Sequence, residues 1–250
     1  MRISRINRKI ISGIKNYFKS AGKRKAVLGL SGGIDSALVA SLASEALGRK
    51  NVAALILPLL GTSSTKNTKD AEKLAQKLGI KSIKVPINIY KKTFFHVPWK
   101  QSRIAGANTN ARLRAVLLYN YANSNECLVV GTGNKTEILL GYFTKFGDGA
   151  ADLFPIGDLW KREVRGLAKY RVIPEEFLGK KPSADLWKGQ TDEGELGLSY
   201  EEMDSILGLL EKGKASKAKA DFGDKKIKKL KERMGVNRHK SLPTPVIKVH

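Results

Sequence analysis

Two serines, two glycines and an aspartate stand close together in the segment Ser31-Gly32-Gly33-Ile34-Asp35-Ser36. These residue types suit phosphate binding, because glycine lets the main chain approach a ligand closely with its N–H donors. The serine hydroxyls add further donors. The Asp35 carboxylate would repel a phosphate unless a cation intervenes, so we assign it to a bridging Mg²⁺, with helix capping as the plain alternative.

The segment differs from the two common phosphate-binding glycine patterns. It lacks the lysine of G-x-x-x-x-G-K-[ST], and its spacing is not that of G-x-G-x-x-G. The pattern Ser-Gly-Gly-x-Asp-Ser resembles the loop that PP-loop ATP pyrophosphatases carry after their first strand. The resemblance implies that the loop grips the pyrophosphate released when ATP adenylates a substrate oxygen. The implied ATP-binding residues of the loop are Gly29, Leu30, Ser31, Gly32, Gly33, Ile34, Asp35 and Ser36.

A parallel sheet must hold this loop. Four continuous apolar runs predict strands covered on both faces, at 25–31, 51–58, 82–87 and 126–132. Three segments of helical length and period lie between them, at 35–47, 66–78 and 108–122. This alternation predicts an α/β, Rossmann-like fold, a parallel β-sheet flanked by helices on both faces. Ligands of such sheets bind at the carboxyl ends of the strands, near the switch in strand order.

The chain changes character after the fourth apolar run. A glycine-rich loop leads to Pro155 and to a helix predicted from about 158 to 170. Ser199 and Glu202 form a capping-box pattern before another helical segment. We expect a single domain over 1–250, made of an amphipathic helix at 1–24, a PP-loop α/β core at 25–170, a mobile loop at 180–198, and C-terminal helices with a tail at 199–250.

Composition indicates a folded globular protein. Hydrophobic residues make up 42% of the chain, and no apolar run approaches the roughly 20 residues that span a bilayer. The single cysteine, Cys127, excludes a disulfide within the chain, and its apolar neighbours predict a buried thiol. We therefore expect a cytoplasmic location and no membrane partner.

The net charge of +23 favours polyanion binding and raises nucleic acid as a possible partner. The excess charge is concentrated at 1–25 and 212–235. The first stretch resembles a transit peptide, but its isoleucines recur at helical spacing, which predicts a retained helix packed on the domain or on a partner subunit. The second lacks interleaved aromatics, so solvated helix faces or adaptation to heat explain it. We expect no specific nucleic-acid partner.

Blocks along nearly the whole chain resemble the NAD synthetase family. They are NTNARLRAVLLYNYAN (108–123), VVGTGNKTEILLGYFTKFGDGAADLFPIGDLWKREVRGLA (129–168), KPSADLWKGQTDEGELGLSYEEMD (181–204) and HK (239–240). The run G-Y-F-T-K-F-G-D-G-x-A-D within the second block is highly specific. The resemblance implies an ammonia-dependent ligase that amidates deamido-NAD to NAD. In that reaction the nicotinate carboxylate attacks the α-phosphate of ATP, pyrophosphate leaves, and ammonia then displaces AMP from the acyl-adenylate.

The resemblance also assigns residues to ATP and Mg²⁺. It implies Glu137 as the second magnesium ligand beside Asp35, against the alternative of an exposed acid in a first helical turn. Thr132 and Ser183 would contact ATP, and Lys161 would reach its phosphates. Because the attacking carboxylate is already ionised at neutral pH, the first step needs charge neutralisation and in-line positioning and no general base. Asp35 and Lys161 are therefore implied as catalytic.

Five further residues are implied to bind deamido-NAD: Arg112, Lys145, Asp152, His239 and Lys240. Asp152 would also attract ammonium or remove its proton, since only NH₃ is nucleophilic, which makes Asp152 the third implied catalytic residue. A surface histidine in a basic tail is the alternative for His239. Arg114 lies on another helical face from Arg112 and is the weaker candidate.

Two features depart from better-known family members. Those members often have the sequence G-T-D after this strand, whereas this chain has Gly133 and Asn134 after Thr132. The local loop geometry is therefore expected to differ from theirs. About 25 residues precede the first predicted strand, so we expect no glutamine-hydrolysing domain there, and free ammonia or ammonia from a separate protein as the nitrogen source. The resemblance further implies a homodimer with deamido-NAD near the subunit interface.

Two other functions compete with this interpretation. Another PP-loop ATP pyrophosphatase, GMP synthetase-like or tRNA-modifying, would use the same glycine loop. The single cysteine disfavours tRNA thiolases, and we find no GMP-synthetase dimerisation domain in the C-terminal third. A nucleic-acid-binding protein is supported by the charge alone.

Overall fold

A parallel sheet forms the centre of the fold in this computed structural model, which describes residues 2–94, 96–180, 182–183 and 191–249. Within these residues the sheet has the order β3-β2-β1-β4. Its strands are β1 (Lys25–Gly29), β2 (Val52–Ile56), β3 (Lys81–Lys84) and β4 (Cys127–Val129). The structure confirms the predicted parallel α/β fold, although each strand is shorter than its apolar run.

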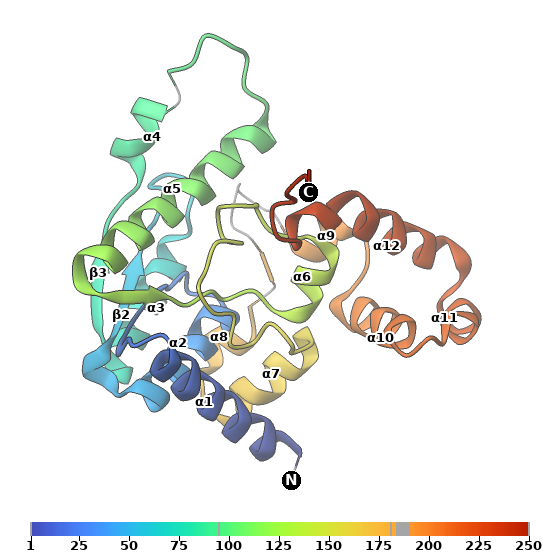
Figure 1. The fold of residues 1–250 in the computed structure, drawn as a ribbon, viewed down its shortest axis with the longest axis horizontal. Coiled ribbons are helices and arrows are strands. Elements are labelled where there is room, and N and C mark those ends of the chain that lie inside the picture. Colours follow the sequence, from blue (N-terminus) through green and yellow to red (C-terminus); the bar gives the residue numbers. More distant parts are fainter. Residues whose placement is uncertain (1, 95, 181, 184–190, 250) are drawn as a thin grey trace.

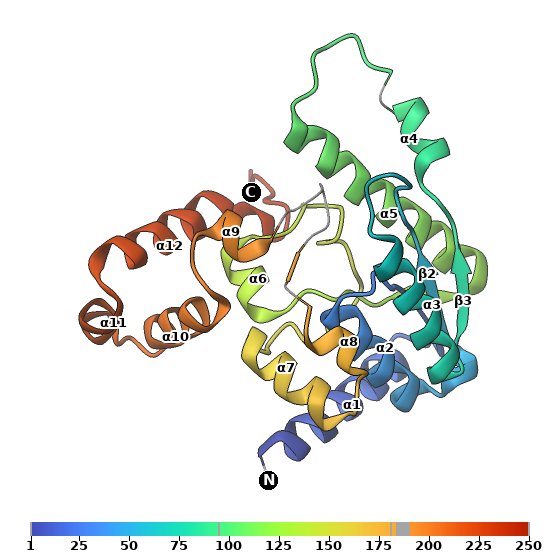
Figure 2. The ribbon, with the colours of Figure 1, turned by 180° about the vertical axis from the view of Figure 1, so that it is seen from behind.

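Helices cover both faces of the sheet, as Figures 1 and 2 show. Side chains of β1 alternate between two cores, Ala26 and Leu28 in one and Val27 in the other. The first core also contains side chains of α1 (Arg2–Ser20), α2 (Ile34–Leu47), α3 (Thr65–Leu78), α7 (Lys161–Tyr170) and α8 (Glu175–Leu178). The second is covered by α5 (Arg103–Asn125), which follows the short helix α4 (Asn88–Phe94). Burial on both faces explains why β1 and β2 lie in continuous apolar runs. The edge strand β3 is mostly exposed, so the prediction that it is covered on both faces was wrong.

The amphipathic N-terminal helix is confirmed as α1. Its apolar stripe, including Ile14 and Phe18, is buried against α2 and α7. Arg171 fastens the helix further, because its guanidinium donates to the Asn7 side chain at 2.7 Å and to the Ser41 hydroxyl at 3.0 Å. The basic N-terminal segment therefore packs on this chain's own core.

A third hydrophobic core holds the C-terminal helices together. These helices are α9 (Asp192–Leu196), α10 (Tyr200–Glu211), α11 (Ala215–Phe222) and α12 (Asp224–Asn237), and α6 (Lys135–Leu140) packs with them. Tyr200, Met203 and Leu230 are buried in this core. The predicted capping box of Ser199 and Glu202 begins α10. The group stands to one side of the sheet in Figure 1 and borders the carboxyl ends of the strands through α6.

Several boundaries differ from the sequence predictions. The helix predicted from about 158 begins at Lys161, and the helix predicted at 108–122 extends over Arg103–Asn125. The helices α4, α6, α8 and α9 were missed, because one or two turns give too short a periodic signal, whereas α11 lies in the stretch 212–235 that was expected to form helix faces. Of the loop predicted at 180–198, residues 181 and 184–190 lie outside the described residues, and Asp192–Leu196 forms α9.

The buried cysteine expected from the composition is confirmed. The Cys127 thiol is buried at the start of β4, and burial raises its pKa. Among the described helices, none combines the length and apolar character needed to cross a membrane.

Candidate active site

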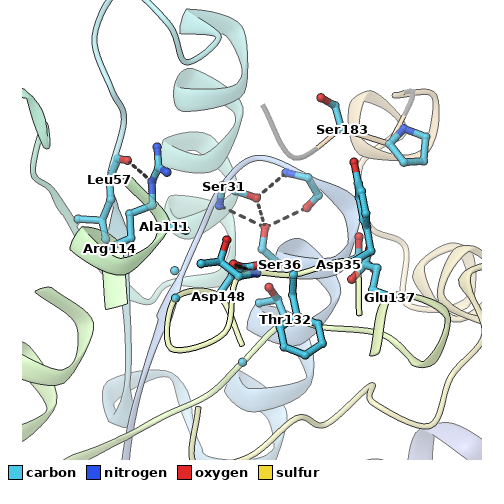
Figure 3. Close-up of a pocket in the computed structure, with 18 of the residues that line it drawn as sticks. Ser31, Asp35, Ser36, Leu57, Ala111, Arg114, Thr132, Glu137, Asp148 and Ser183 are labelled. Carbon is cyan, nitrogen blue, oxygen red and sulfur yellow. Dashed lines mark hydrogen bonds between the residues drawn. The ribbon is translucent and has the colours of Figure 1, made fainter. Parts of the chain in front are cut away.

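Two loops meet where the strand order switches. The glycine loop follows β1 and residues 130–134 follow β4, and these two strands are neighbours although about 100 residues separate them in sequence. Together with α5, α6 and the start of α7 the loops line a cavity of about 640 Å³. Figure 3 shows Ser31, Asp35, Thr132 and Glu137 around this cavity. A cavity therefore lies at the carboxyl ends of the strands, where a ligand was predicted to bind.

The glycine loop is held in a fixed conformation. The Ser36 hydroxyl accepts from the Ser31 N–H at 3.2 Å and donates to the Gly33 carbonyl at 3.0 Å. Gly32 has a φ of +82°, and a Cβ there would overlap the main chain of Asn67 on α3. The helix α2 begins at Ile34, directly after Gly33, and the first N–H groups of a helix have no intrahelical acceptor. These donors and the helix dipole favour an anion at this place.

A lysine that we did not predict supports the loop. The Lys180 ammonium donates to the Gly32 carbonyl at 2.8 Å and to the Asp70 carboxylate on α3 at 2.7 Å. Lys180 also lines the cavity. The contact ties the segment after α8 to the glycine loop. Nothing in the local sequence pattern distinguishes this lysine from its surface neighbours.

Asp35, Glu137 and Lys161 meet at one side of the cavity. The Lys161 Nζ lies 2.6 Å from Asp35 Oδ2 and 3.2 Å from Glu137 Oε1. The Lys161 side chain is 2% exposed, whereas each carboxylate is 18% exposed. The two acids can therefore still be reached from the cavity, and they are held together by a cation from the protein itself.

Burial and neighbouring charges shift the pKa values of this group. Burial raises the pKa of Glu137 above its ordinary value, Lys161 opposes that shift, and Asp35 adds to it. Burial also disfavours the charged form of Lys161, but Asp35 and Glu137 outweigh it and raise the pKa of the ammonium. Lys161 therefore keeps its positive charge at neutral pH. A cation close to Glu137 lowers the pKa of its carboxyl group, as Lys161 does.

Asn134 connects the two acids. Its side chain caps α6 by accepting from the Glu137 N–H at 3.1 Å, and the Glu137 carboxylate accepts from the Asn134 N–H at 3.3 Å. The Asn134 amide also donates to Asp35 Oδ1 at 2.9 Å. Asn134 was noted in the sequence only as a departure from G-T-D. The N-x-x-E spacing is a capping-box pattern that could have identified it.

Two tyrosines extend the acidic side of the cavity. The buried Tyr200 hydroxyl donates to Asp192 Oδ2 at 2.9 Å, and the Tyr142 hydroxyl donates to Glu195 Oε2 at 3.0 Å. Burial and then the carboxylates raise the pKa of both hydroxyls, so both remain protonated donors. These tyrosines were not predicted from the sequence, because their contacts join α9 and α10 to α6 and the segment after it and have no local signature.

The residues predicted to bind ATP all line the cavity. Besides the glycine loop, 29–36, these are Thr132, Lys161 and Ser183. Glu137, predicted as a metal ligand, lines it as well. Figure 3 shows Ser183 across the cavity from Thr132. The structure thus brings together residues from four segments that are separate in the sequence.

Four of the residues predicted for the dinucleotide form a chain of contacts at the rim. Arg112 donates to the Lys145 carbonyl at 3.3 Å, and the Lys145 ammonium donates to the His239 carbonyl at 2.8 Å. Next to His239, Lys240 donates to the Gly141 and Phe143 carbonyls, and burial lowers its pKa. Of these four only Lys240 lines the cavity, while Arg112 and His239 are exposed.

Arg114 and Asp152 are placed differently from the sequence expectation. Arg114, the weaker candidate, lines the cavity and donates to the Leu57 carbonyl at 2.9 Å. Asp152 accepts from the Val129 N–H at 2.7 Å and from the Tyr119 hydroxyl at 3.4 Å, and it borders a separate cavity of about 410 Å³. The structure therefore does not bring Asp152 to the Asp35–Lys161 group of the same chain.

The side chains of Asp35 and Glu137 suit a magnesium ion. Among the described residues, His, Cys, Asp and Glu nowhere form a group of three or more that could hold a metal ion. Magnesium in nucleotide sites is held by one or two carboxylates together with substrate phosphates and waters. Two partly accessible carboxylates already paired with an ammonium match this donor set.

Comparisons with known proteins agree on one family. Residues 6–244 match the family model described as NAD synthase. Two curated relatives are named NH(3)-dependent NAD(+) synthetase. The one from Archaeoglobus fulgidus is 44% identical over 100% of this chain and 98% of its own length, and the one from Methanosarcina acetivorans is 43% identical over 98% of both.

Solved structures agree with this result. The NMN synthetase from Francisella tularensis superposes with a TM-score of 0.89 at 34% identity and covers 98% of both chains. The NH3-dependent NAD synthetase from Campylobacter jejuni, in complex with the nitrate ion, has a TM-score of 0.86 at 34% identity, covering 99% of this chain and 100% of that one.

Proposed function

The chain belongs to the NAD synthase family, and on that premise we propose how its cavity amidates deamido-NAD. Like its curated relatives it is an ammonia-dependent ligase of C–N bond formation that consumes ATP. One observation carries the assignment of the chemistry to this cavity. The glycine loop, Lys161 and the carboxylates of Asp35 and Glu137 converge on a space large enough for a nucleotide.

The glycine loop would bind the β- and γ-phosphates of ATP. Its conformation is fixed by the Ser31–Ser36 contacts and by Lys180, so little ordering is needed when the phosphates bind. Thr132 and Ser183, which lie on opposite sides of the cavity, would contact the same nucleotide. Pyrophosphate would remain in the loop when the α-phosphate is attacked.

Lys161 would assist adenylation by shifting from the carboxylates to the phosphates. Its ammonium stays charged at neutral pH and offers three donors. Asp35 and Glu137 would hold Mg²⁺, which when bound neutralises the negative charge that develops on the phosphates. The substrate carboxylate needs no general base, so the roles left to these residues are positioning and neutralisation of charge.

Arg112, Lys145, His239 and Lys240 would bind the dinucleotide. Their contacts with one another place them at one rim, yet three of the four lie outside the cavity of their own chain. A second copy of the chain would complete the site. Val116, 60% exposed and four residues from Arg112 on α5, and Phe146, 64% exposed and next to Lys145, offer apolar surface beside these residues. We infer a homodimer with the dinucleotide near its interface.

Asp152 remains our candidate for binding the dinucleotide and for handling ammonium. Since it borders a cavity away from Lys161 of its own chain, it would act on dinucleotide bound across the interface. We also propose a single domain over 1–250 and a cytoplasmic location, where ATP and the dinucleotide are available.

The mononucleotide is a second candidate substrate. It is favoured by the superposition with the Francisella tularensis NMN synthetase, whose TM-score exceeds that of the Campylobacter jejuni NAD synthetase. Amidation of nicotinate mononucleotide would need the same adenylation apparatus and fewer contacts at the rim. The curated relatives with 43% and 44% identity favour the dinucleotide.

A product assay tests the proposal. Purified protein with ATP, Mg²⁺, ammonium and deamido-NAD should yield NAD with AMP and pyrophosphate, at a higher kcat/KM than with the mononucleotide. Formation of ADP, or a preference for the mononucleotide, would contradict it. Asp35→Asn should lower kcat about 100-fold or more with the fold intact. Asp158→Asn is the matched control, since Asp158 is 96% exposed and should leave kcat unchanged.

A further inference from the structure

Asp204 on α10 is fully buried, and both of its carboxylate oxygens are paired. Oδ1 accepts from the Thr136 hydroxyl at 2.5 Å, and Oδ2 accepts from the Arg162 N–H at 2.9 Å. Thr136 is also fully buried, and its hydroxyl oxygen accepts from the Lys161 N–H at 3.3 Å. A buried carboxylate costs free energy unless it is paired in this way. Three segments that are distant in sequence therefore meet at Asp204.

The partners of Asp204 lie beside two residues of the proposed active site. Thr136 directly precedes Glu137 in the first turn of α6, and Lys161 and Arg162 are the first two residues of α7. The residue before α7 is Trp160, whose indole cannot accept a hydrogen bond from the helix. Asp204 and Thr136 supply these acceptors instead, so the start of α7 is fixed by a residue of α10 and a residue of α6.

The same face of α10 contacts the active-site side chains. Tyr200 lies four residues before Asp204, which places the two side chains on one helical face. The Tyr200 hydroxyl is 3.5 Å from Glu137 Oε1, and the Tyr200 ring centre is 4.9 Å from Lys161 Nζ. The helix α10 thus contacts the Glu137–Lys161 pair in two ways. Tyr200 contacts the two side chains directly, and Asp204 binds residues next to them in sequence.

We propose that Asp204 and Thr136 are positioning residues that set the distance between Glu137 and Lys161. Neither residue lines the cavity, in the part of the chain that is described, so neither is expected to touch substrate. The inference rests on the function proposed above, because it assigns the pair to the adenylation step. A displacement of Lys161 relative to Glu137 would reduce charge neutralisation in the transition state while leaving the substrate-binding walls in place.

Thr136→Val and Thr136→Ser test the proposal. Valine has the shape of threonine without the hydroxyl, so it leaves Asp204 Oδ1 and the Lys161 N–H without their partner. We expect Thr136→Val to lower kcat about 10- to 100-fold with the KM for deamido-NAD changed less than about twofold. Serine keeps the hydroxyl, and Thr136→Ser should stay within about threefold of the wild-type kcat. A wild-type kcat for Thr136→Val, or equal losses in both variants, would overturn the proposal.

Asp204→Asn is a second, independent test of the same proposal. Asparagine keeps one acceptor and turns an amide donor toward either Thr136 or the Arg162 N–H. We expect a loss of kcat similar to that of Thr136→Val, and a double variant that falls no further than the more affected single one, since the two act as a unit. Additive losses would overturn the proposal. Ser205→Ala, beside Asp204 on α10, is the matched control and should leave kcat unchanged. Thermal unfolding of each variant is measured by circular dichroism, and kcat is assayed below the unfolding transition so that only folded protein is compared.

Binding of ATP separates this inference from the proposed function. If the wild-type protein forms no NAD or AMP, the proposed function fails. The pair is then judged by calorimetry with ATP and Mg²⁺. An affinity for Thr136→Val about tenfold weaker than for Thr136→Ser supports positioning of the Glu137–Lys161 pair, and equal affinities contradict it.

Discussion

Asn134 forms hydrogen bonds with both carboxylates of the proposed magnesium site. It begins α6 as the N-cap that fixes Glu137, and its amide donates to Asp35. The two contacts use different atoms, Oδ1 for the cap and Nδ2 for Asp35. Substitution can therefore separate the stability of α6 from the placement of Asp35.

Asn134→Ser should separate these two effects. Serine caps a helix about as well as asparagine, so the free energy of unfolding should change by only a few tenths of a kcal/mol. Serine is too short to hold Asp35, and kcat should fall about tenfold. Asn134→Ala should lose about 1 kcal/mol of stability in addition, because the cap is lost. Thermal unfolding and steady-state kinetics measure the two effects. An unchanged kcat for Asn134→Ser would show that the contact with Asp35 has no effect on catalysis.

The acids and the lysine of the site could be predicted from sequence, whereas their supports could not. Asp35, Glu137 and Lys161 stand in motifs that resemble a known family, and the structure brings all three together. Lys180 and Tyr200 act through contacts between distant segments. No local spacing or periodicity encodes such contacts, so they become visible only when the segments are packed.

At the scale of elements, the glycine loop depends on the helix beside it. The start of α3 approaches so closely that Gly32 has no room for a side chain, and Gly32 also adopts a positive φ. The glycine is thus required twice, by the backbone conformation and by the packing of α3. The main chain of the loop can move away from α3 only by changing the place where phosphates would bind.

Gly32→Ala should disrupt this arrangement. The added Cβ would overlap the Asn67 main chain and strain the positive φ, so the loop must shift. We expect the affinity for ATP to fall at least about 100-fold, as for a displaced catalytic geometry, which calorimetry with ATP and Mg²⁺ measures. Gly13→Ala is the control, since Gly13 lies in α1 with open space around it. It should leave ATP binding unchanged and stabilise the protein by about 0.5–1 kcal/mol. Unaltered affinity in Gly32→Ala would rule out phosphate binding by this loop.

The longer elements were predictable because their periodicity extends over several turns. The helices α2, α3 and α10 begin and end close to the predicted positions, with glycine or serine caps that the sequence displays. The start of α7 was placed about three residues early, because its N-terminal acceptors come from α10 and α6. A boundary fixed by tertiary contacts has no signature in the local sequence.

At the scale of the whole molecule, part of the proposed dinucleotide site lies on the exposed surface. Arg112 is exposed on α5 together with Val116, and Lys145 adjoins the exposed Phe146. Basic residues with apolar neighbours suit an interface that also contacts a dinucleotide. Where these residues lie relative to a second chain depends on subunit packing, which one sequence does not specify.

Val116→Glu tests the dimer. The wild-type protein should sediment at twice the 27.5 kDa chain mass at micromolar concentration. A carboxylate buried in an apolar interface costs free energy, so the variant should dissociate at least about tenfold more readily and show a higher KM for deamido-NAD. Val236→Glu on α12, 76% exposed in the wild-type chain, is the control and should remain dimeric. A monomeric wild-type protein with full activity would refute the shared site.

The position of β1 between β2 and β4 determines when the nucleotide site can fold during synthesis of the chain. The glycine loop is synthesised early, but its neighbouring strand, β4, is completed only at Val129, and the buried acceptor Asp204 follows much later. A nascent chain therefore cannot assemble the nucleotide site until most of its length has been translated. Truncation after α7 would preserve every described strand and still remove Lys180, Ser183 and Asp204, so premature termination products should bind ATP more weakly than the full chain.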